Sequence, residues 1–432
     1  MQPILILNYA SYLEPLGGGS KADRYIAESI AAAGRPCKVV VPASHCEFDA
    51  TYAGENSYTV ETQLLNGVSL DIVFESRQSH YRRSTGLVIH AVKQIKALRP
   101  RSILICGSDR GYQLLKIAAT HSNESNVIYI PRTTLDLPFG PNALVQDAYA
   151  TNCLHASDAI LCPSQYLVDY IAKWGNGLQA SKFDVPVYGQ PPFHNFGDNP
   201  GEHITLINPS KIKGISIFLE LAKLHPDWNF AAVPTWATTS ADLLSMSRQP
   251  NIRILKPSRC IADIFNQTKV LIVPSLWDES FGMIVVEAML HGIPVLASNV
   301  GGLPEAKLGT DFLLPVNPIS SFSTLDPVTR APHAEVGLQP IHEWSVPLQM
   351  LMADAEAYRS LSKKSRQAAE TYVRSLNLAQ LESIWSRKRA TYPSREAIAL
   401  RPFAHHEIPS EVRQGIISAF RKKHERNDSQ GA

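Results

Sequence analysis

Two glutamates stand where a predicted strand ends and a predicted helix begins. The strand covers residues 270–273, Glu279 lies in the loop after it, and Glu287 lies on the helix that follows Phe281-Gly282. The first N–H groups of such a helix have no partner within the helix, and they face the carboxyl edge of the sheet, where open α/β folds bind anions. Carboxylates repel a phosphate but accept hydrogen bonds from hydroxyl groups. The pair therefore indicates a sugar attached to a phosphate, although two ordinary solvated glutamates are the alternative.

A second glycine-containing loop follows at the next predicted strand. His291-Gly292 ends the helix, residues 293–297 form a buried strand, and the loop Gly301-Gly302-Leu303-Pro304-Glu305 comes after it. Glycine permits tight turns that leave backbone N–H groups exposed. Two such turns at adjacent strand ends predict a single anion-binding rim.

The run from Pro274 to Glu305 resembles the signature of the retaining family-four glycosyltransferases, which have the GT-B fold and a Glu-x7-Glu motif. The match includes the Phe-Gly after the first glutamate and the Gly-Gly-x-Pro-Glu loop, and the resemblance extends over most of residues 1–375. In that family the first glutamate contacts sugar hydroxyls, the Phe-Gly amides meet the sugar and phosphate, and the second glutamate holds the ribose. The resemblance thus implies donor-binding roles for Glu279, Ser280, Phe281, Gly282, Met283 and Glu287.

Two further loops agree with this resemblance. Gly18 and Gly19 lie between the first strand and a helix expected near Ala22, where relatives place a Gly-Gly loop against the donor diphosphate; a plain tight turn is the alternative. In the second half, relatives have an arginine and, five residues later, a Lys-Gly pair, and both cations neutralise the leaving diphosphate. Lys213 matches the lysine, but Asn208 replaces the arginine.

An amide donates a hydrogen bond but cannot offset charge, so the missing positive charge must come from another residue. The candidates are Lys211, Arg110 and Arg132. Lys256 is a further donor-binding candidate, because it lies in a loop that holds the nucleobase in relatives.

The first half supplies the candidates for the acceptor side. Relatives carry a histidine after the strand at 127–130, whereas this chain has Arg132 and Thr133 there. Arg132 joins Glu279 and Lys213 as a catalytic candidate. The acceptor-binding candidates are Asp109, Arg110, Thr133 and Phe139. For Asp109, capping of the helix that follows is an equal alternative.

The elements that must position these residues form two similar series. A chain of 432 residues is too long for one core. Continuous apolar strands alternate with helical segments in both halves, which predicts parallel sheets covered on both faces. The predicted strands are residues 4–7, 38–41, 103–105, 127–130, 159–161, 203–207, 230–233, 252–255 and 270–273. The predicted helices include residues 22–33, 85–97, 113–119 and 216–223.

The predicted fold class is therefore α/β of the GT-B type, with two doubly wound Rossmann-like domains facing across a cleft. An N-terminal acceptor-binding domain covers residues 1–195, and a nucleotide-sugar donor-binding domain covers residues 202–375. Residues 376–432 form a helix that crosses back to the first domain and a polar, basic tail. The tail is either a solvated helix end or a peripheral contact with a membrane surface.

Composition excludes several other classes. The net charge of +2 gives no reason to expect a nucleic-acid partner, and no apolar run reaches membrane-spanning length. The start of the chain reads as a first strand without a targeting leader. The six cysteines show no metal-ligand spacing, which predicts buried free thiols in a reducing cytoplasm. No metal and no cofactor is expected, since the nucleotide-sugar is a substrate.

The resemblance thus implies a retaining hexosyltransferase, and the absence of a metal-ligand cluster predicts that it is metal-independent. It moves a sugar from a nucleotide-sugar, most frequently a UDP-sugar in this family, to an acceptor hydroxyl in saccharide, glycolipid or natural-product biosynthesis. The alternatives are a nucleotide-sugar-binding GT-B protein that has lost catalysis, or another GT-B activity such as sugar-nucleotide epimerisation. Acceptor, sugar and oligomeric state are left open.

Overall fold

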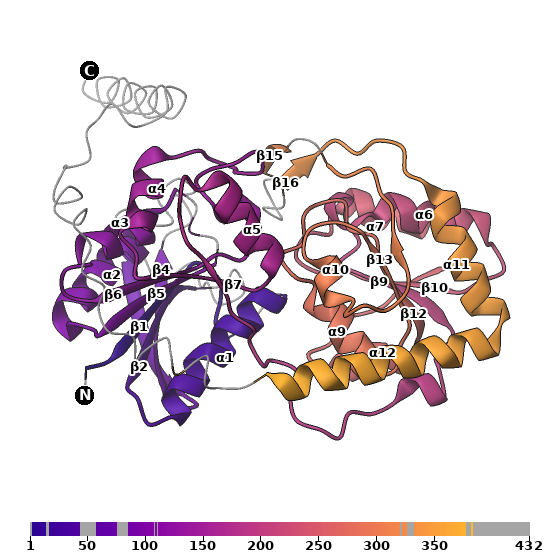
Figure 1. Cartoon of the computed structure of the whole chain (residues 1–432), viewed down its shortest axis with the longest axis horizontal. Helices are drawn as coiled ribbons and strands as arrows, with labels where there is room; N and C mark the ends of the chain where they lie inside the picture. Colours follow the sequence, from indigo (N-terminus) through magenta and orange to yellow (C-terminus); the bar gives the residue numbers. More distant parts are fainter. Residues whose placement is uncertain are drawn as a thin grey trace, which may run out of the picture. The chain divides into compact units, whose positions relative to one another are not determined.

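The computed structural model describes residues 2–13, 17–43, 58–75, 85–107, 109, 111–319, 322–325, 332–376 and 382. The candidate Arg110 and most of the expected crossing helix and tail lie outside these residues. The described chain builds two large parallel sheets with helices on their faces (Figure 1). We call each sheet with its helices a lobe.

The first lobe is built on an eight-stranded sheet in the order β3-β4-β2-β1-β5-β6-β7-β8. Its strands are β1 Ile4–Asn8, β2 Cys37–Pro42, β3 Tyr58–Leu65, β4 Val68–Glu75, β5 Ser102–Cys106, β6 Asn126–Ile130, β7 Ala159–Cys162 and β8 Ser181–Lys182. Its helices are α1 Gly18–Ala32, α2 Thr85–Leu98, α3 Gln113–Thr120, α4 Ala148–His155 and α5 Gln165–Trp174, with a 3₁₀ turn η1 at Thr134–Asp136. Only β3 pairs antiparallel among the described strand pairs of this sheet.

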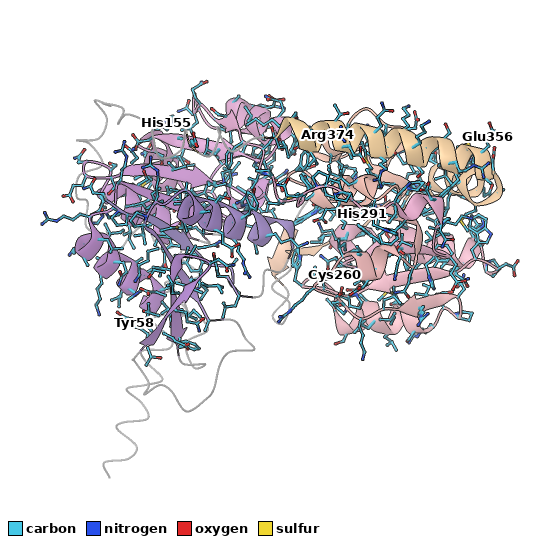
Figure 2. All side chains as sticks on the ribbon, turned by 90° about the horizontal axis from the view of Figure 1, so that it is seen from below. Tyr58, His155, Cys260, His291, Glu356 and Arg374 are labelled. Carbon is cyan, nitrogen blue, oxygen red and sulfur yellow. The ribbon has the colours of Figure 1, made fainter. Side chains whose placement is uncertain are left out.

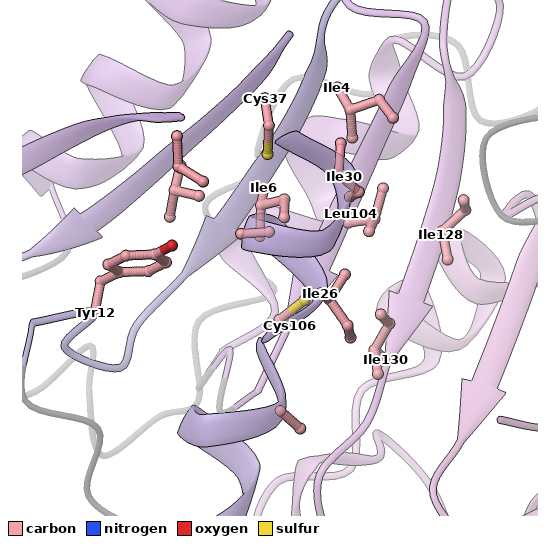
Figure 3. Close-up of a cluster of buried hydrophobic side chains, with 14 of the residues drawn as sticks. Ile4, Ile6, Tyr12, Ile26, Ile30, Cys37, Leu104, Cys106, Ile128 and Ile130 are labelled. Atoms are coloured by element: carbon pink, nitrogen blue, oxygen red, sulfur yellow. The ribbon is translucent and has the colours of Figure 1, made fainter. Parts of the chain in front are cut away.

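Alternate residues of each strand point to opposite faces, and both faces are buried, as expected for a parallel sheet between helices. Ile4 and Ile6 join Ile26 of α1 in one apolar cluster (Figure 3). Leu5 and Leu7 are equally buried on the other face. Cys37 and Cys106 belong to the first cluster, as expected for buried thiols, whereas Cys260 in the second lobe is exposed.

The second lobe has a six-stranded parallel sheet in the order β11-β10-β9-β12-β13-β14, which is the order of a doubly wound dinucleotide-binding fold. The strands are β9 His203–Ile207, β10 Phe230–Val233, β11 Ile252–Ile254, β12 Thr268–Val273, β13 Val295–Ser298 and β14 Leu313–Leu314. The helices are α6 Ile215–Leu224, α7 Ser240–Ser247, α8 Ala262–Phe265, α9 Met283–Leu290, α10 Leu303–Ala306, α11 Ile341–Ala353 and α12 Ala355–Ser375. Two 3₁₀ turns, η2 Phe196–Asp198 and η3 Lys211–Lys213, and a hairpin of β15 Phe322–Leu325 with β16 Pro332–Ala334 complete the list.

The two faces of this sheet bury different helices. Val270 and Ile272 of β12 pack in a cluster with α6 and α11, while their neighbours Leu271 and Val273 pack with α9 and α10. Helix α12 lies along α9, and Glu356 and Arg374 mark its two ends in Figure 2. This packing fixes α9, the helix that carries Glu287, against the sheet.

Two local predictions require correction. Helix α1 begins at Gly18, not near Ala22, so the glycines belong to its first turn. The segment 58–65 is not among the predicted strands, but it forms strand β3, which pairs with β4 across the turn at Asn66-Gly67, where both residues have positive φ. Asn-Gly between strands is a strong hairpin signal. Among the described helices, none is long and apolar enough to cross a membrane.

Candidate functional site

The candidate site lies at the point of the second sheet where the strand order reverses. Lys213 follows β9 and Glu279 follows β12, and these two strands are neighbours in the sheet. The chain continues from β9 to one edge of the sheet and from β12 to the other edge. In open α/β sheets, ligands bind beyond the carboxyl ends of the strands at such a switch point. The predicted motif residues are therefore placed where this fold binds ligands.

Glu279 and Lys213 form a direct ion pair between Oε1 and Nζ. Ser275 Oγ donates a second hydrogen bond to the same oxygen at 2.5 Å, and Lys213 Nζ lies 4.6 Å from the centre of the Trp277 ring. Burial by itself raises the pKa of Glu279, but Lys213 and Ser275 outweigh it and hold that pKa below its usual value. Glu279 is therefore an ionised hydrogen-bond acceptor at neutral pH.

Close backbone contacts fix the loop that carries Glu279. A Cβ on Gly214, whose φ is +76°, would lie 1.9 Å from the carbonyl oxygen of Pro274, so only glycine fits there. On the other side, Gly302 N–H donates to the carbonyl of Glu279 at 2.7 Å. The second glycine loop was predicted to add exposed amides to an anion-binding rim. That prediction is wrong for Gly302, because its N–H is used to hold the Glu279 loop.

The N-terminus of α9 meets the N-terminus of α1 from the first lobe. Gly282 precedes α9 with φ +101°, and the Met283 side chain packs so closely on α1 that a Cβ on Gly18 would lie 2.7 Å from Met283 Cε. Phe281 is buried, and its ring lies 6.0 Å from that of Tyr372 on α12. Its side chain is therefore a packing group, which leaves the backbone amides of this turn for a ligand. Ser280 is half-buried, with its carbonyl against Gly302.

Glu287 also meets the first lobe. Its Oε1 lies 3.5 Å from Lys21 Nζ on α1, and 15% of its side chain is exposed. Burial raises the pKa of Glu287, and Lys21 only partly offsets this effect. Glu287 thus lies between the lobes with a weak partner. Lys21 was not among the predicted site residues, and the 266 positions that separate it from Glu287 give no local signal.

Asn208 has a structural role that was not predicted. Its φ is +63°, its side chain is buried, and its Oδ1 accepts a hydrogen bond from Ala237 N at 3.1 Å. Asparagine is one of the few non-glycine residues that adopt this left-handed conformation readily. The amide oxygen therefore supports the loop after β10. This contact accounts for an asparagine here without any contact to a donor.

Arg132 is equally committed within the first lobe. It forms an ion pair with Asp23 of α1, and Asp23 also accepts a hydrogen bond from Asn8 Nδ2 at 2.8 Å. Burial lowers the pKa of Arg132, but Asp23 raises it further, so the net shift is upward. The Arg132 side chain also lies 3.5 Å from the position of a Cβ on Gly19. Arg132 therefore supports the first turn of α1, and its charge is already balanced.

Three acceptor-side candidates have contacts within the first lobe, and an acceptor-binding role for each of them stays a prediction. Asp109 is 2% exposed and accepts hydrogen bonds from the N–H groups of Leu114 and Leu115, so it caps α3. Thr133 caps η1 by accepting from Leu135 N at 2.8 Å. Phe139 is buried. These groups stabilise their own loops, because the helical turns that begin after the strands have free N–H groups that need acceptors.

The two remaining lysine candidates contact nothing in the site. Lys211, at the start of η3, and Lys256, after β11, are both exposed. Neither belongs to the group that Lys213 and Glu279 form. A role in donor binding for either stays a prediction.

Further contacts that the sequence did not predict join the lobes. Asn142 Nδ2 donates to Asp278 Oδ2 at 2.5 Å, and Glu305 Oε2 accepts from Gln165 N at 2.7 Å. A cavity of about 10 Å³ beside the first contact is lined by Thr134, Leu135, Asn142, Trp277, Asp278 and Ile319. That is room for about one water. A hollow of about 480 Å³ along α12, lined by residues of α12 and Leu308, contains none of the predicted site residues.

In the described part of the chain, no three His, Cys, Asp or Glu side chains are grouped so that they could hold a metal ion. The charged groups gathered here are instead paired with each other across loops and lobes. They form a polar site whose carboxylates accept hydrogen bonds and whose lysines offer positive charge.

Comparisons with known proteins agree with this geometry. Residues 205–324 match the family model described as glycosyl transferases group 1. A D-inositol 3-phosphate glycosyltransferase of Streptomyces avermitilis is 52% identical over 46 residues, which are 11% of this chain and 10% of that protein. The alignments with the first curated relatives span a quarter or less of each relative's length.

Solved structures match over nearly the whole chain. Sucrose-phosphate synthase from Thermosynechococcus elongatus matches with a TM-score of 0.65 at 15% identity. The match covers 88% of this chain and 96% of the synthase chain. Anabaena HepE in complex with UDP and glucose has a TM-score of 0.62 at 15% identity, with coverages of 90% and 100%. The predicted α/β fold with two parallel-sheet domains is thereby confirmed. The chain therefore has the GT-B fold, and its residues 205–324 are similar to the glycosyl transferases group 1 family.

Proposed function

We propose that this protein is a glycosyltransferase that moves a sugar from a nucleotide-sugar, in the first place a UDP-sugar, to an acceptor hydroxyl with retention of configuration. The observation that carries the proposal is the Glu279–Lys213 pair at the switch point of the second sheet, beside the N-terminus of α9. HepE, a structural neighbour, was solved with UDP-glucose, which supports the choice of donor.

In this proposal, transfer is driven by electrostatic stabilisation of the leaving diphosphate. Lys213 offers an ammonium group, and the first N–H groups of α9 offer unpaired donors. Glu279, kept ionised by Lys213 and Ser275, accepts hydrogen bonds from sugar hydroxyls and orients the ring. Glu287 does the same for the ribose. These groups are fixed by packing before a ligand arrives, which is what electrostatic catalysis requires.

The partners of the acidic groups support the retaining part of the proposal. Glu279 is paired with Lys213, Asp23 on the first lobe is paired with Arg132, and Glu287 is assigned to the ribose in this proposal. With the carboxylates so engaged, the leaving phosphate oxygen is the natural proton acceptor. The bond from the anomeric carbon to that oxygen breaks, the acceptor oxygen bonds on the same face, and its proton passes to the phosphate.

The variant Glu279→Ala tests the proposal. The wild type is expected to consume a UDP-sugar in the presence of a panel of saccharide, glycolipid and small hydroxylated acceptors, and to show a higher melting temperature with the donor. The variant is expected to lose about 10²–10³-fold in turnover, as for removal of one group that acts on the transition state. It should keep part of its affinity for UDP, because the nucleotide has other contacts.

A matched control is Glu220→Ala, since Glu220 is an exposed glutamate of α6 paired with Lys223 at 2.6 Å. It should leave turnover unchanged. If the wild type binds UDP-sugars but consumes none with any acceptor, the chain is a binding protein and not a transferase. Consumption without any acceptor, giving an isomeric nucleotide-sugar, would instead favour an epimerase.

A further inference from the structure

The proposed site has one cation fewer than the sites of relatives. A diphosphate leaving group develops negative charge. Relatives neutralise this charge with two cations, whereas this chain has Asn208 in place of the arginine. Lys213 supplies one cation, although it also pairs with Glu279, and Arg132 is paired with Asp23. The side-chain oxygen of Asn208 accepts a hydrogen bond from Ala237 N. A further cation that is free to reach the diphosphate is needed.

Lys21 lies where that charge is needed. It belongs to the first turns of α1, whose Gly18 packs on Met283 at the start of α9. The ammonium group therefore lies near the meeting point of two helix N-termini, which both favour anions. Its partner is Glu287, one of the two glutamates proposed to hold the donor.

The pair of Lys21 with Glu287 is weak. The separation of 3.5 Å exceeds the usual 2.7–2.9 Å of a charge-assisted hydrogen bond, and 44% of the Lys21 side chain is exposed. Ion pairs of exposed lysines contribute little stability. Glu287, by contrast, is largely buried, and its raised pKa shows that Lys21 compensates its burial only in part. Lys21 can therefore leave this partner at small cost once another donor satisfies Glu287.

We propose that Lys21 is the second diphosphate-binding cation and replaces the arginine that is missing at Asn208. Without donor, Lys21 neutralises Glu287. With donor, ribose hydroxyls donate to Glu287, and the ammonium group of Lys21 turns to the diphosphate. This inference rests on the proposed function. Because Lys21 is on the first lobe and Glu287 on the second, the charge reaches the diphosphate only when the lobes are in contact, so domain closure and stabilisation of the leaving group are coupled.

The affinities for UDP and UMP separate this role from that of an ordinary ion pair. Both nucleotides place a ribose at Glu287, but only UDP has the second phosphate. Lys21→Gln is expected to weaken UDP binding about 10–100-fold and UMP binding much less, as for the loss of a charged hydrogen bond. Lys21→Arg should restore most of the UDP affinity. Titration calorimetry measures UDP, and ligand-observed NMR measures UMP at millimolar concentration.

Two further variants keep the result interpretable. Lys364→Gln removes an exposed lysine that pairs with Asp311 at 2.8 Å and should change neither affinity. The double variant Lys21→Gln with Glu287→Gln removes the unpaired buried carboxylate. If Lys21→Gln alone fails to fold, the double variant is compared with Glu287→Gln alone and should show the same selective loss of UDP affinity.

The two proposals fail in different ways. If the wild type consumes donor and Lys21→Gln keeps the same ratio of UDP to UMP affinity, the role of Lys21 is overturned and the transferase stands. If UDP and UMP lose affinity equally, Lys21 is only an ion-pair partner, and its role is again overturned. A wild type that binds no nucleoside diphosphate and consumes no nucleotide-sugar overturns both.

Discussion

Asn208 combines an unusual backbone conformation with a buried contact. A residue other than glycine, asparagine or aspartate loses about 1–2 kcal/mol in the left-handed region, and a buried N–H without its acceptor costs roughly 1–3 kcal/mol. The N–H of Ala237 donates to Asn208, and Ala237 is almost fully buried. Asn208→Ala should therefore lower the free energy of unfolding by roughly 2–4 kcal/mol, measured by urea denaturation with tryptophan fluorescence.

Asn208→Gly separates the two effects, because glycine adopts the same φ at no cost but offers no acceptor. Its free energy of unfolding should fall only by the part that the hydrogen bond contributes. Asn208→Arg, which restores the residue of the relatives, should be at least as unstable as the alanine variant. Equal stability of wild type and Asn208→Ala would show that neither the conformation nor the contact matters.

At this scale the sequence identified residue types better than partners. Glu279 and Lys213 could be predicted because their spacing from strand ends is local, and the structure places them in contact. Asp109, Thr133 and Arg132 were predicted to bind ligands at strand ends, and the structure shows that each also has a partner within the protein. A cap and a ligand-binding group use the same residue types, so position alone does not separate them. Lys21 and Glu287 meet only through the packing of α1 on α9.

Among the elements, α10 and β13 are joined by a buried lysine. Lys307 follows α10, is fully buried, and donates from Nζ to the carbonyl of Val295 at 2.6 Å. Burial lowers the pKa of Lys307 to about 7. An unfolded lysine has a pKa of about 10.4, so between pH 7 and 10 the unfolded state binds a proton that the folded state does not. Stability therefore falls as the pH falls through this range, and the full cost applies below about pH 7.

Lys307→Met tests this linkage. Methionine fills similar space without a charge, so the variant should be more stable than the wild type by roughly 2–4 kcal/mol at pH 6, with the advantage shrinking towards pH 10. Denaturant titrations at several pH values give the two curves. Lys364→Met, an exposed lysine of α12, should show no such trend. An advantage that does not vary with pH would mean that Lys307 stays charged when buried.

The elements themselves were largely predictable, since both sheets follow from apolar runs that alternate with helices. The predicted and observed elements differ where a local turn or helix-start signal was not used. The Asn66-Gly67 turn makes a hairpin of β3 and β4, and the N–H groups of Gly18 and Gly19 belong to the first turn of α1. Glycines at a helix start are consistent with the approach of Met283, which leaves no room for a side chain at Gly18.

For the molecule as a whole, the described contacts between the lobes combine the apolar packing of Met283 on α1 with several polar pairs. They include Asn142 with Asp278, Lys21 with Glu287, and Glu305 with the first N–H of α5 and with Lys182 at 2.6 Å. The cavity beside Asp278 has room for about one water, so a sugar can enter there only if the lobes move apart. Opening and closing should therefore accompany each turnover.

Glu305→Ala should shift this equilibrium towards the open form. The variant leaves the N–H of Gln165 and the ammonium group of Lys182 without their shared acceptor, and charged hydrogen bonds of this kind contribute about 1.5–3 kcal/mol. The radius of gyration from small-angle X-ray scattering should be larger than that of the wild type without ligand, and a saturating UDP-sugar should bring the two together. The melting temperature should change little, because each lobe keeps its own core, and transfer should slow roughly tenfold as closure becomes less favourable. Glu220→Ala, on the surface of the second lobe, serves as the control and should scatter like the wild type. An unchanged radius of gyration together with an unchanged rate would mean that Glu305 does not hold the lobes together, and that closure depends on the contacts near Asp278 and Glu287 alone.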